Sequence, residues 1–178
     1  MLRVEDERDA IVIGRLLAGA AKTIATVRSC WLVTEDETGG ANVRPMGRIS
    51  PAPDGNDWTL WLLADDRSRK VSDIRRASKV AILFQRAPDD AYVTLIGWAS
   101  LRQRASEDRQ RWKDAYDAYF PSDADRANAT FIEIDVARME LWIRGVTPEP
   151  FGLQATILER DAEGVWRLLP SDRAPARP

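Results

Sequence analysis

The chain has 178 residues, of which 44% are hydrophobic and 30% charged, a balance typical of a globular domain that can bury a core. It contains no histidine and one cysteine, Cys30, so we expect no internal disulfide, no usual zinc or iron site and no histidine-activated nucleophile. A net charge of −2 gives no reason to expect a nucleic-acid partner. No long apolar run and no signal peptide are visible, which predicts a cytoplasmic location without a membrane span.

The first hundred residues are expected to hold most of the strands. An apolar stripe that includes Ile11 and Leu16 predicts a helix over residues 5–22. Short apolar runs separated by turn-forming residues then predict strands over 30–34, 41–50, 58–64, 79–85 and 91–101. A short helix is expected over residues 71–77, between the third and the fourth of these strands.

The rest of the chain predicts a long helix over residues 106–119 and a sixth strand over 129–143. A terminal hairpin over 151–169 then leads into a frayed tail at 170–178. Six to eight short strands with a few helices favour a mainly β fold, which is a small barrel or a sandwich in one domain that spans the whole chain. The order of elements does not fit the regular alternation of a parallel α/β sheet.

The segment Arg44-Pro45-Met46 lies inside a predicted strand. Because proline cannot donate a ladder hydrogen bond, Pro45 predicts an edge or a break in strand pairing. Such a break frees neighbouring backbone groups to face a ligand, and the planar guanidinium of Arg44 suits a phosphate. The alternative is an ordinary edge strand that carries an exposed arginine.

A basic cluster follows the third predicted strand, in the stretch ADDRSRKVSDIRR. Ser68, Arg69 and Lys70 precede the short helix, whose N-terminal N–H groups attract anions. A hydroxyl, a guanidinium and an ammonium group would add charge-assisted donors for a phosphate. A solvated basic loop is the alternative, but a hairpin of strands two and three would bring Arg44 close to residues 67–70.

Two further features have a structural and a functional interpretation. Gly97, inside the fifth predicted strand, indicates a bulge, a close approach by another group, or a bend of the barrel. The seven tryptophans are expected in the core or at a dimer interface, with one or two available to a planar ring. Cys30 is expected to be a small core residue rather than a nucleophile.

Four motifs in this order resemble a known family: NVRPM, LWLLADDRSRK, IRRASKVAILF and AYVTLIGWASL. The chain is similar over about residues 5–145 to the pyridoxamine 5′-phosphate oxidase-like FMN-binding split-barrel proteins, and within them to the general stress protein 26-type branch. The resemblance implies a six- to eight-stranded antiparallel FMN-binding split barrel. It also implies a homodimer with the cofactor at its interface.

The resemblance assigns residues to the cofactor position by position. Those that would bind the FMN phosphate are Arg44, Ser68 and Lys70, with Arg69 beside them. Those that would border the isoalloxazine ring, mainly through backbone groups, are Pro45, Met46, Gly47, Leu62 and Leu63. Trp98 and Trp112 are guesses for residues that reach the ring from the second chain, and no metal ligand is expected.

The function is expected to be that of an FMN-dependent oxidoreductase that acts on an unknown small molecule, with the flavin carrying the chemistry. The resemblance names no catalytic residue for this chain. Two alternatives stay open: a flavin-binding stress protein without enzymatic activity, and a split barrel that binds the deazaflavin F420 or no cofactor.

Overall fold

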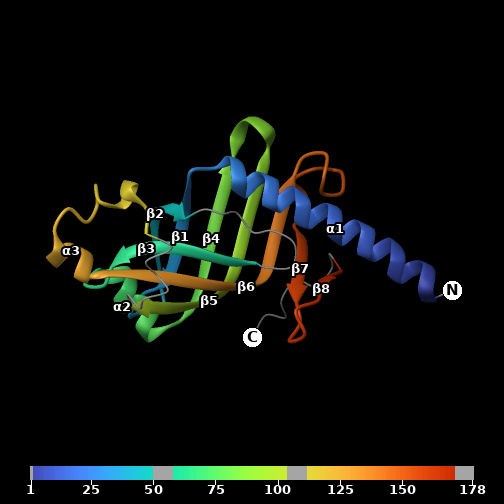
Figure 1. The fold of residues 1–178 in the computed structure, drawn as a ribbon. Coiled ribbons are helices and arrows are strands. Elements are labelled where there is room, and N and C mark those ends of the chain that lie inside the picture. Colours follow the sequence, from blue (N-terminus) through green and yellow to red (C-terminus); the bar gives the residue numbers. More distant parts are fainter. Residues whose placement is uncertain (1, 50–57, 104–111, 171–178) are drawn as a thin grey trace.

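A computed structural model describes residues 2–49, 58–103 and 112–170 of the chain. Its strands are β1 (Ser29–Glu35), β2 (Ala41–Ile49), β3 (Thr59–Asp65), β4 (Lys79–Arg86), β5 (Ala91–Gln103), β6 (Ala129–Ile143), β7 (Thr156–Arg160) and β8 (Trp166–Leu168). Its α-helices are α1 (Leu2–Thr26), α2 (Arg69–Arg76) and α3 (Asp123–Ala127), and two 3₁₀ turns, η1 (Ala87–Asp89) and η3 (Asp114–Tyr116), complete the described elements. Figure 1 shows the strands wrapped into one curved sheet, with α1 along one side of it.

The sheet is antiparallel and has the strand order β3-β2-β1-β4-β5-β6-β7-β8. It curls so far that β3 also pairs with the first half of β6, while the second half of β6 pairs with β7. In the described residues, β2 and β3 are joined only through Arg48 with Leu62 and Ile49 with Trp61. The mainly β, split-barrel prediction is therefore confirmed, with the split beside β2.

Alternation along each strand separates an inner face from an outer face. On β1 the buried residues are Cys30, Leu32 and Thr34, and they face the core together with inward residues of β4. Cys30 is thus a core residue, as predicted. α1 contributes Leu16 to the core, but Ile11, predicted to lie on the same stripe, is exposed because the buried stripe of α1 begins only near Leu16.

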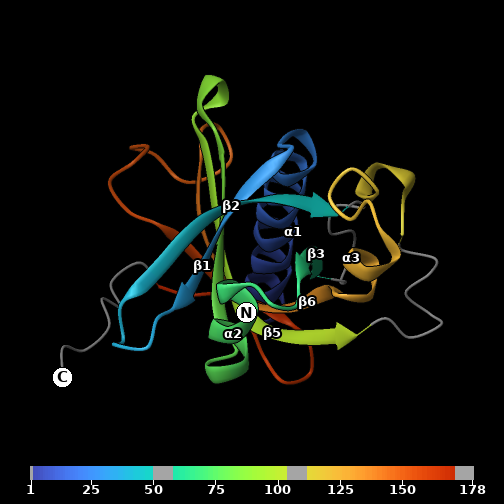
Figure 2. The same cartoon turned by 90° about the vertical axis from the view of Figure 1, so that its left-hand side faces the viewer.

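Helix α2 lies at the end of the barrel away from the N-terminus of α1 (Figure 1). It begins two residues before the predicted 71–77 helix and buries Val71, Asp73 and Ile74. Arg76 donates a hydrogen bond to the carbonyl of Glu35, which places α2 beside the end of the β1–β2 hairpin (Figure 2). The polar residue Asp73 is therefore buried between two apolar positions of this short helix.

The predicted long helix over 106–119 is wrong in its described part, and residues 106–111 lie outside the described ranges. Residues 112–119 form the 3₁₀ turn η3 and further turns with i→i+3 hydrogen bonds. Side chains favour this tighter path: the Trp112 indole donates to Asp117, and Arg126 bonds both Asp117 and the carbonyl of Phe120. The short helix α3, which was not predicted, follows and begins with a capping box of Ser122 and Asp125.

The C-terminal hairpin is confirmed, although its strands are shorter than the predicted 151–169. β7 begins at Thr156, because residues 151–154 form turns and bends, and β8 pairs with it in antiparallel fashion. The turn between them has Gly164 at a φ of 83°, a left-handed conformation that glycine adopts without strain. The predicted tail lies outside the described residues beyond Pro170.

Gly97 marks both a bulge and a close approach of two strands. The pairing of β5 with β6 shifts register between Ile96 and Gly97. A Cβ atom added at Gly97 would lie 2.8 Å from the carbonyl carbon of Asp135 and 3.0 Å from the Cα atom of Val136. Both obstacles are backbone atoms, so this position has no room for a side chain.

We predict that Gly97→Ala lowers the free energy of unfolding by about 3 kcal/mol, because the β5 and β6 backbones would have to separate. Thermal unfolding measures the change. Gly14→Ala is the control: a Cβ at Gly14 in the exposed middle of α1 meets nothing within 4 Å. This control should gain about 0.5–1 kcal/mol. A Gly97→Ala protein as stable as the parent would contradict the close approach.

Candidate functional site

The basic stretch after β3 is partly neutralised by its own aspartates. Arg67 pairs with Asp65 at 2.6 Å, and Arg75 pairs with Asp66 at 2.5 Å. Both pairs are well exposed, and such pairs contribute little to stability. These contacts hold two of the five cations of the stretch in the turn itself and leave the residues around Lys70 to be considered separately.

Ser68 and Lys70 are not neutralised in this way. Ser68 is the N-cap of α2, yet its side chain makes no capping hydrogen bond, and its buried Oγ atom has no partner in the described part of the chain. Lys70 is half-buried in the first turn of the helix, and Arg69 between them is exposed. The first N–H groups of a helix have no intrahelical acceptor, so this end of α2 offers several donors.

Arg44 reaches the same end of the barrel from β2. Its backbone lies opposite Leu32, so its side chain belongs to the inner face. One terminal nitrogen, Nη2, donates to Thr34 Oγ1 at 2.7 Å and lies 3.3 Å from Asp73 Oδ2. The other, Nη1, is buried and has no hydrogen-bond partner among the described residues. Arg44 is thus held by one nitrogen and has a donor to offer with the other.

The two cations Arg44 and Lys70 affect each other. The pKa of Lys70 is lowered, first by burial of its ammonium group and then by the charge of Arg44, while Asp65 acts in the opposite direction. Two positive groups within electrostatic reach, with unpartnered donors beside them, would be stabilised by a bound anion. The predicted convergence of Arg44 with the 67–70 turn therefore agrees with the electrostatics.

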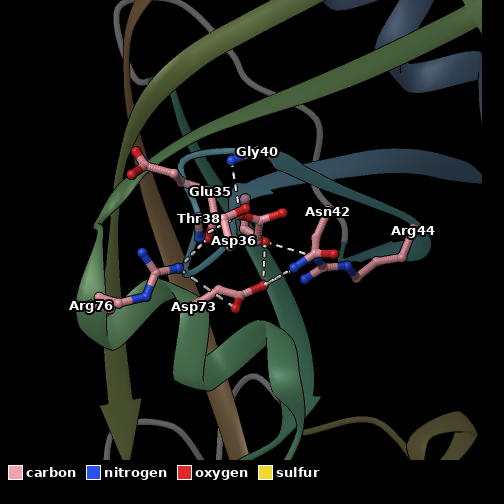
Figure 3. A network of polar contacts seen from close by, with 9 residues as sticks. Glu35, Asp36, Thr38, Gly40, Asn42, Arg44, Asp73 and Arg76 are labelled. Carbon is pink, nitrogen blue, oxygen red and sulfur yellow. Dashed lines mark hydrogen bonds and ion pairs between the residues drawn. The ribbon is translucent and has the colours of Figure 1, made fainter.

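Asp73 is the centre of the polar network in this region. Figure 3 shows it on α2, reaching toward Asn42 and Arg44 on β2, with Arg76 on its other side. Its Oδ2 atom accepts hydrogen bonds from Thr34 at 2.7 Å and from Asn42 at 3.1 Å. Burial by itself would raise the pKa of Asp73, but the hydrogen bonds from Thr34, Asn42 and Arg44 together with the charge of Arg44 lower it. Asp73 is therefore ionised at neutral pH.

The residues predicted to border a ring lie on both faces of the barrel wall. Pro45 and Gly47 are exposed on the outer face, whereas Met46 is buried and its carbonyl accepts from Cys30 Sγ at 3.6 Å. Leu62 is fully buried, and Leu63 is half-buried on β3. Their contact with a flavin stays a prediction, as does the phosphate contact of Arg44, Ser68, Arg69 and Lys70.

Sequence reasoning missed three members of the network: Thr34, Asn42 and Asp73. Thr34 occupies an inward position of β1, and Asp73 lies between the apolar Val71 and Ile74 on α2. A charged residue on the apolar face of a short helix was the available signal, since buried charges are nearly always paired. Its partners could not be named without the register of β1 and β2.

A cavity of about 790 Å³ lies elsewhere, between α1 and the segment that precedes β7. Its lining includes Val12, Pro148, Leu153 and Leu168, and none of the predicted cofactor residues. It is therefore separate from the site around Arg44 and Lys70.

The fold and the site define a class of protein: an antiparallel split barrel with an anion-attracting end formed by β2 and the start of α2. The sequence profile described as pyridoxamine 5′-phosphate oxidase like matches residues 18–155. The chain therefore belongs to the pyridoxamine 5′-phosphate oxidase-like family, as its motifs predicted. No curated protein matches the chain.

Solved structures with this fold include three informative cases. A protein from Clostridium acetobutylicum related to general stress protein 26 of B. subtilis is 17% identical, with a TM-score of 0.67 over 82% of this chain and 94% of that chain. A pyridoxamine 5′-phosphate oxidase-related, FMN binding protein from Nostoc punctiforme is 15% identical, with a TM-score of 0.64 over 89% and 95%. A haem binding protein from Mycobacterium smegmatis is 16% identical, with a TM-score of 0.53 over 69% and 52%. At these identities the likeness shows the shared fold.

The helices in the described ranges were also compared with the length and hydropathy that a membrane span needs. None of them is long and apolar enough to cross a membrane.

We predict that Asp73→Asn lowers the free energy of unfolding at pH 7 by about 3 kcal/mol, because it leaves the half-buried Arg44 without its counter-charge. The folded-state pKa of Asp73 lies below its ordinary value of 3.8. Its ionised form therefore stabilises the fold above that pH, and the stabilisation is lost as the pH falls through the lower folded value. The difference between the two proteins should shrink below about pH 3.8.

Urea unfolding at a series of pH values measures this difference. Glu37→Gln is the matched control, since it removes an exposed carboxylate from the β1–β2 hairpin of the same chain. An Asp73→Asn protein whose stability follows that of Glu37→Gln at every pH would show that the network contributes nothing.

Proposed function

We propose that the protein binds FMN, with the phosphate held by Arg44, Ser68 and Lys70 and with Arg69 beside them. The observation that carries this proposal is the pair of buried donors without partners in the described residues, Arg44 Nη1 and Ser68 Oγ. An unsatisfied buried polar group costs about 1–3 kcal/mol, and a phosphate oxygen would satisfy each of them. Family membership and an FMN binding protein of the same fold support the choice of ligand.

The ring of the flavin is proposed to lie along β2 and β3, against the backbone of Pro45, Met46 and Gly47 and beside Leu62 and Leu63. Before Arg48, the β3 side of β2 has no strand partner among the described residues. Backbone N–H and carbonyl groups on that side are available to a planar ring with hydrogen-bonding edges. Proline at position 45 fits this edge, since the strand loses no ladder bond there.

The proposed activity is that of an FMN-dependent oxidoreductase acting on a small molecule. When bound, the flavin would supply hydride transfer, which needs no histidine from the protein. The residues of this chain would bind and orient the cofactor through its phosphate and exclude water with the buried Met46 and Leu62. A flavin-binding protein without enzymatic activity uses the same residues. Reduction by NAD(P)H followed by a screen of electron acceptors separates the two.

Other cofactors are outcomes of the same purification. The haem binding protein with this fold makes haem one possibility, but this chain has no histidine, the commonest axial ligand. The absorbance spectrum of the purified protein distinguishes flavin, deazaflavin F420 and haem. The expected cytoplasmic location stays a prediction.

We predict that Lys70→Ala weakens FMN binding by about tenfold or more and leaves riboflavin binding unchanged, because a charge-assisted hydrogen bond to phosphate is worth about 1.5–3 kcal/mol. Fluorescence titration of both ligands measures the two affinities. Arg67→Ala is the matched control, since it removes a nearby cation that is already paired with Asp65.

Two results would count against FMN as the ligand. Equal weakening of FMN and riboflavin by Lys70→Ala would mean that Lys70 supports the fold rather than the phosphate. Equal or tighter binding of FAD would contradict a site for one terminal phosphate, since the chain has no glycine-rich dinucleotide turn.

We also propose a homodimer with the flavin at its interface. The barrel carries an outer apolar face formed by Trp31 (48% exposed), Val43 (57%), Leu83 (37%) and Trp98 (53%). Trp31 is the cross-strand neighbour of both Leu83 and Pro45, so this face adjoins the proposed ring site. Exposed apolar patches of this kind mark interaction surfaces. The role of Trp98 and Trp112 toward the partner's flavin is part of this proposal.

We predict that Val43→Asp converts the dimer into monomers and releases flavin at the same protein concentration, because each linkage stabilises the other. Analytical ultracentrifugation at micromolar concentration with absorbance detection follows both. Val165→Asp is the matched control: this valine is 53% exposed but lies beside β8, away from the outer apolar face. A monomer that keeps its flavin would defeat the interface proposal and leave the fold unaffected.

A further inference from the structure

We infer that Thr34 is a positioning residue, whose hydroxyl group orients Arg44 so that one guanidinium nitrogen faces the bound anion. This inference rests on the proposed function, since it names what prepares the phosphate-binding arginine. Thr34 is 2% exposed and lies on the inner face of β1, so its hydroxyl has no access to bulk water.

The direction of the hydrogen bonds follows from chemistry. A hydroxyl group has one proton to donate, and an ionised carboxylate can only accept. The Thr34 hydroxyl donates its proton to Asp73 Oδ2 at 2.7 Å. Its lone pairs are then the atoms that meet Arg44 Nη2, also at 2.7 Å. Asp73 thus aims the acceptor side of Thr34 at the arginine.

The guanidinium plane is fixed by these contacts. Nη2 of Arg44 meets both Thr34 Oγ1 and Asp73 Oδ2, and the same Oδ2 atom also accepts from Asn42 at 3.1 Å. Because a guanidinium group is planar and rigid, holding Nη2 also sets the place of Nη1. Nη1 is the nitrogen left without a partner in the described residues. The network therefore presents a single oriented donor.

Thr34 is a sharper test of positioning than Asp73. Replacing Asp73 changes the charge of the site, and a lost negative charge by itself favours an anion. Thr34→Val removes only the hydroxyl group and keeps the branched shape and the charge. Thr34→Ser keeps the hydroxyl group and serves as the conservative variant.

The experiment is a titration of FMN and of riboflavin into the parent protein and both variants. We expect Thr34→Val to weaken FMN by about three- to tenfold, the worth of one hydrogen bond, and to leave riboflavin unchanged. Thr34→Ser should bind FMN as the parent does. An equal loss for both ligands, or no loss of FMN affinity in Thr34→Val, overturns the inference. If Thr34→Val does not fold, Thr34→Ala takes its place.

A second measurement separates this inference from the proposed function. The Arg44 side-chain N–H signals in NMR spectra of the protein without ligand, identified by their loss in Arg44→Lys, report how fast the guanidinium group rotates. We expect slow rotation in the parent and faster rotation in Thr34→Val, whereas an unchanged signal overturns the inference. A parent protein that binds FMN no better than riboflavin refutes the proposed function, and the rotation still shows whether Thr34 holds Arg44.

Discussion

The buried carboxylate of Asp73 is the interaction on which this end of the barrel depends. Taking an ion out of water costs several kcal/mol, and only close partners offset that cost. Thr34, Asn42 and Arg44 supply them from β1 and β2, while Asp73 itself comes from α2. One side chain therefore ties the helix to two strands and, in the same contacts, sets the place of the arginine proposed to bind phosphate.

The positive charge in the linear sequence overstates the charge of the site. Asp65 and Asp66 pair with Arg67 and Arg75, and Asp73 shares Arg44. The exposed pairs add little stability, but they hold two cations away from the inner face. What remains is local: a half-buried lysine, a serine hydroxyl and one arginine nitrogen. An anion would meet a few directed donors rather than a diffuse positive surface.

Local patterns predicted the strands well and the network poorly, for a physical reason. β6 begins and ends at the predicted residues because its side chains are apolar along the whole strand, which is a property of consecutive residues. Asp73 meets Thr34 across 39 positions of the chain, and that meeting depends on the register of β1 against β2. The predicted helix before Phe120 failed in its described part because contacts of Arg126, from a later segment, favour a tighter path.

Alternation along β2 gives this one strand two tasks. Arg44 and Met46 point inward, toward the network and the core, while Pro45 and Gly47 belong to the outer face beside Trp31. A ligand that meets both sets of residues has to pass the edge of β2. That edge is free of β3 before Arg48 in the described residues. The split in the barrel is thus the feature that lets a phosphate on the inner side and a ring on the outer side belong to one molecule.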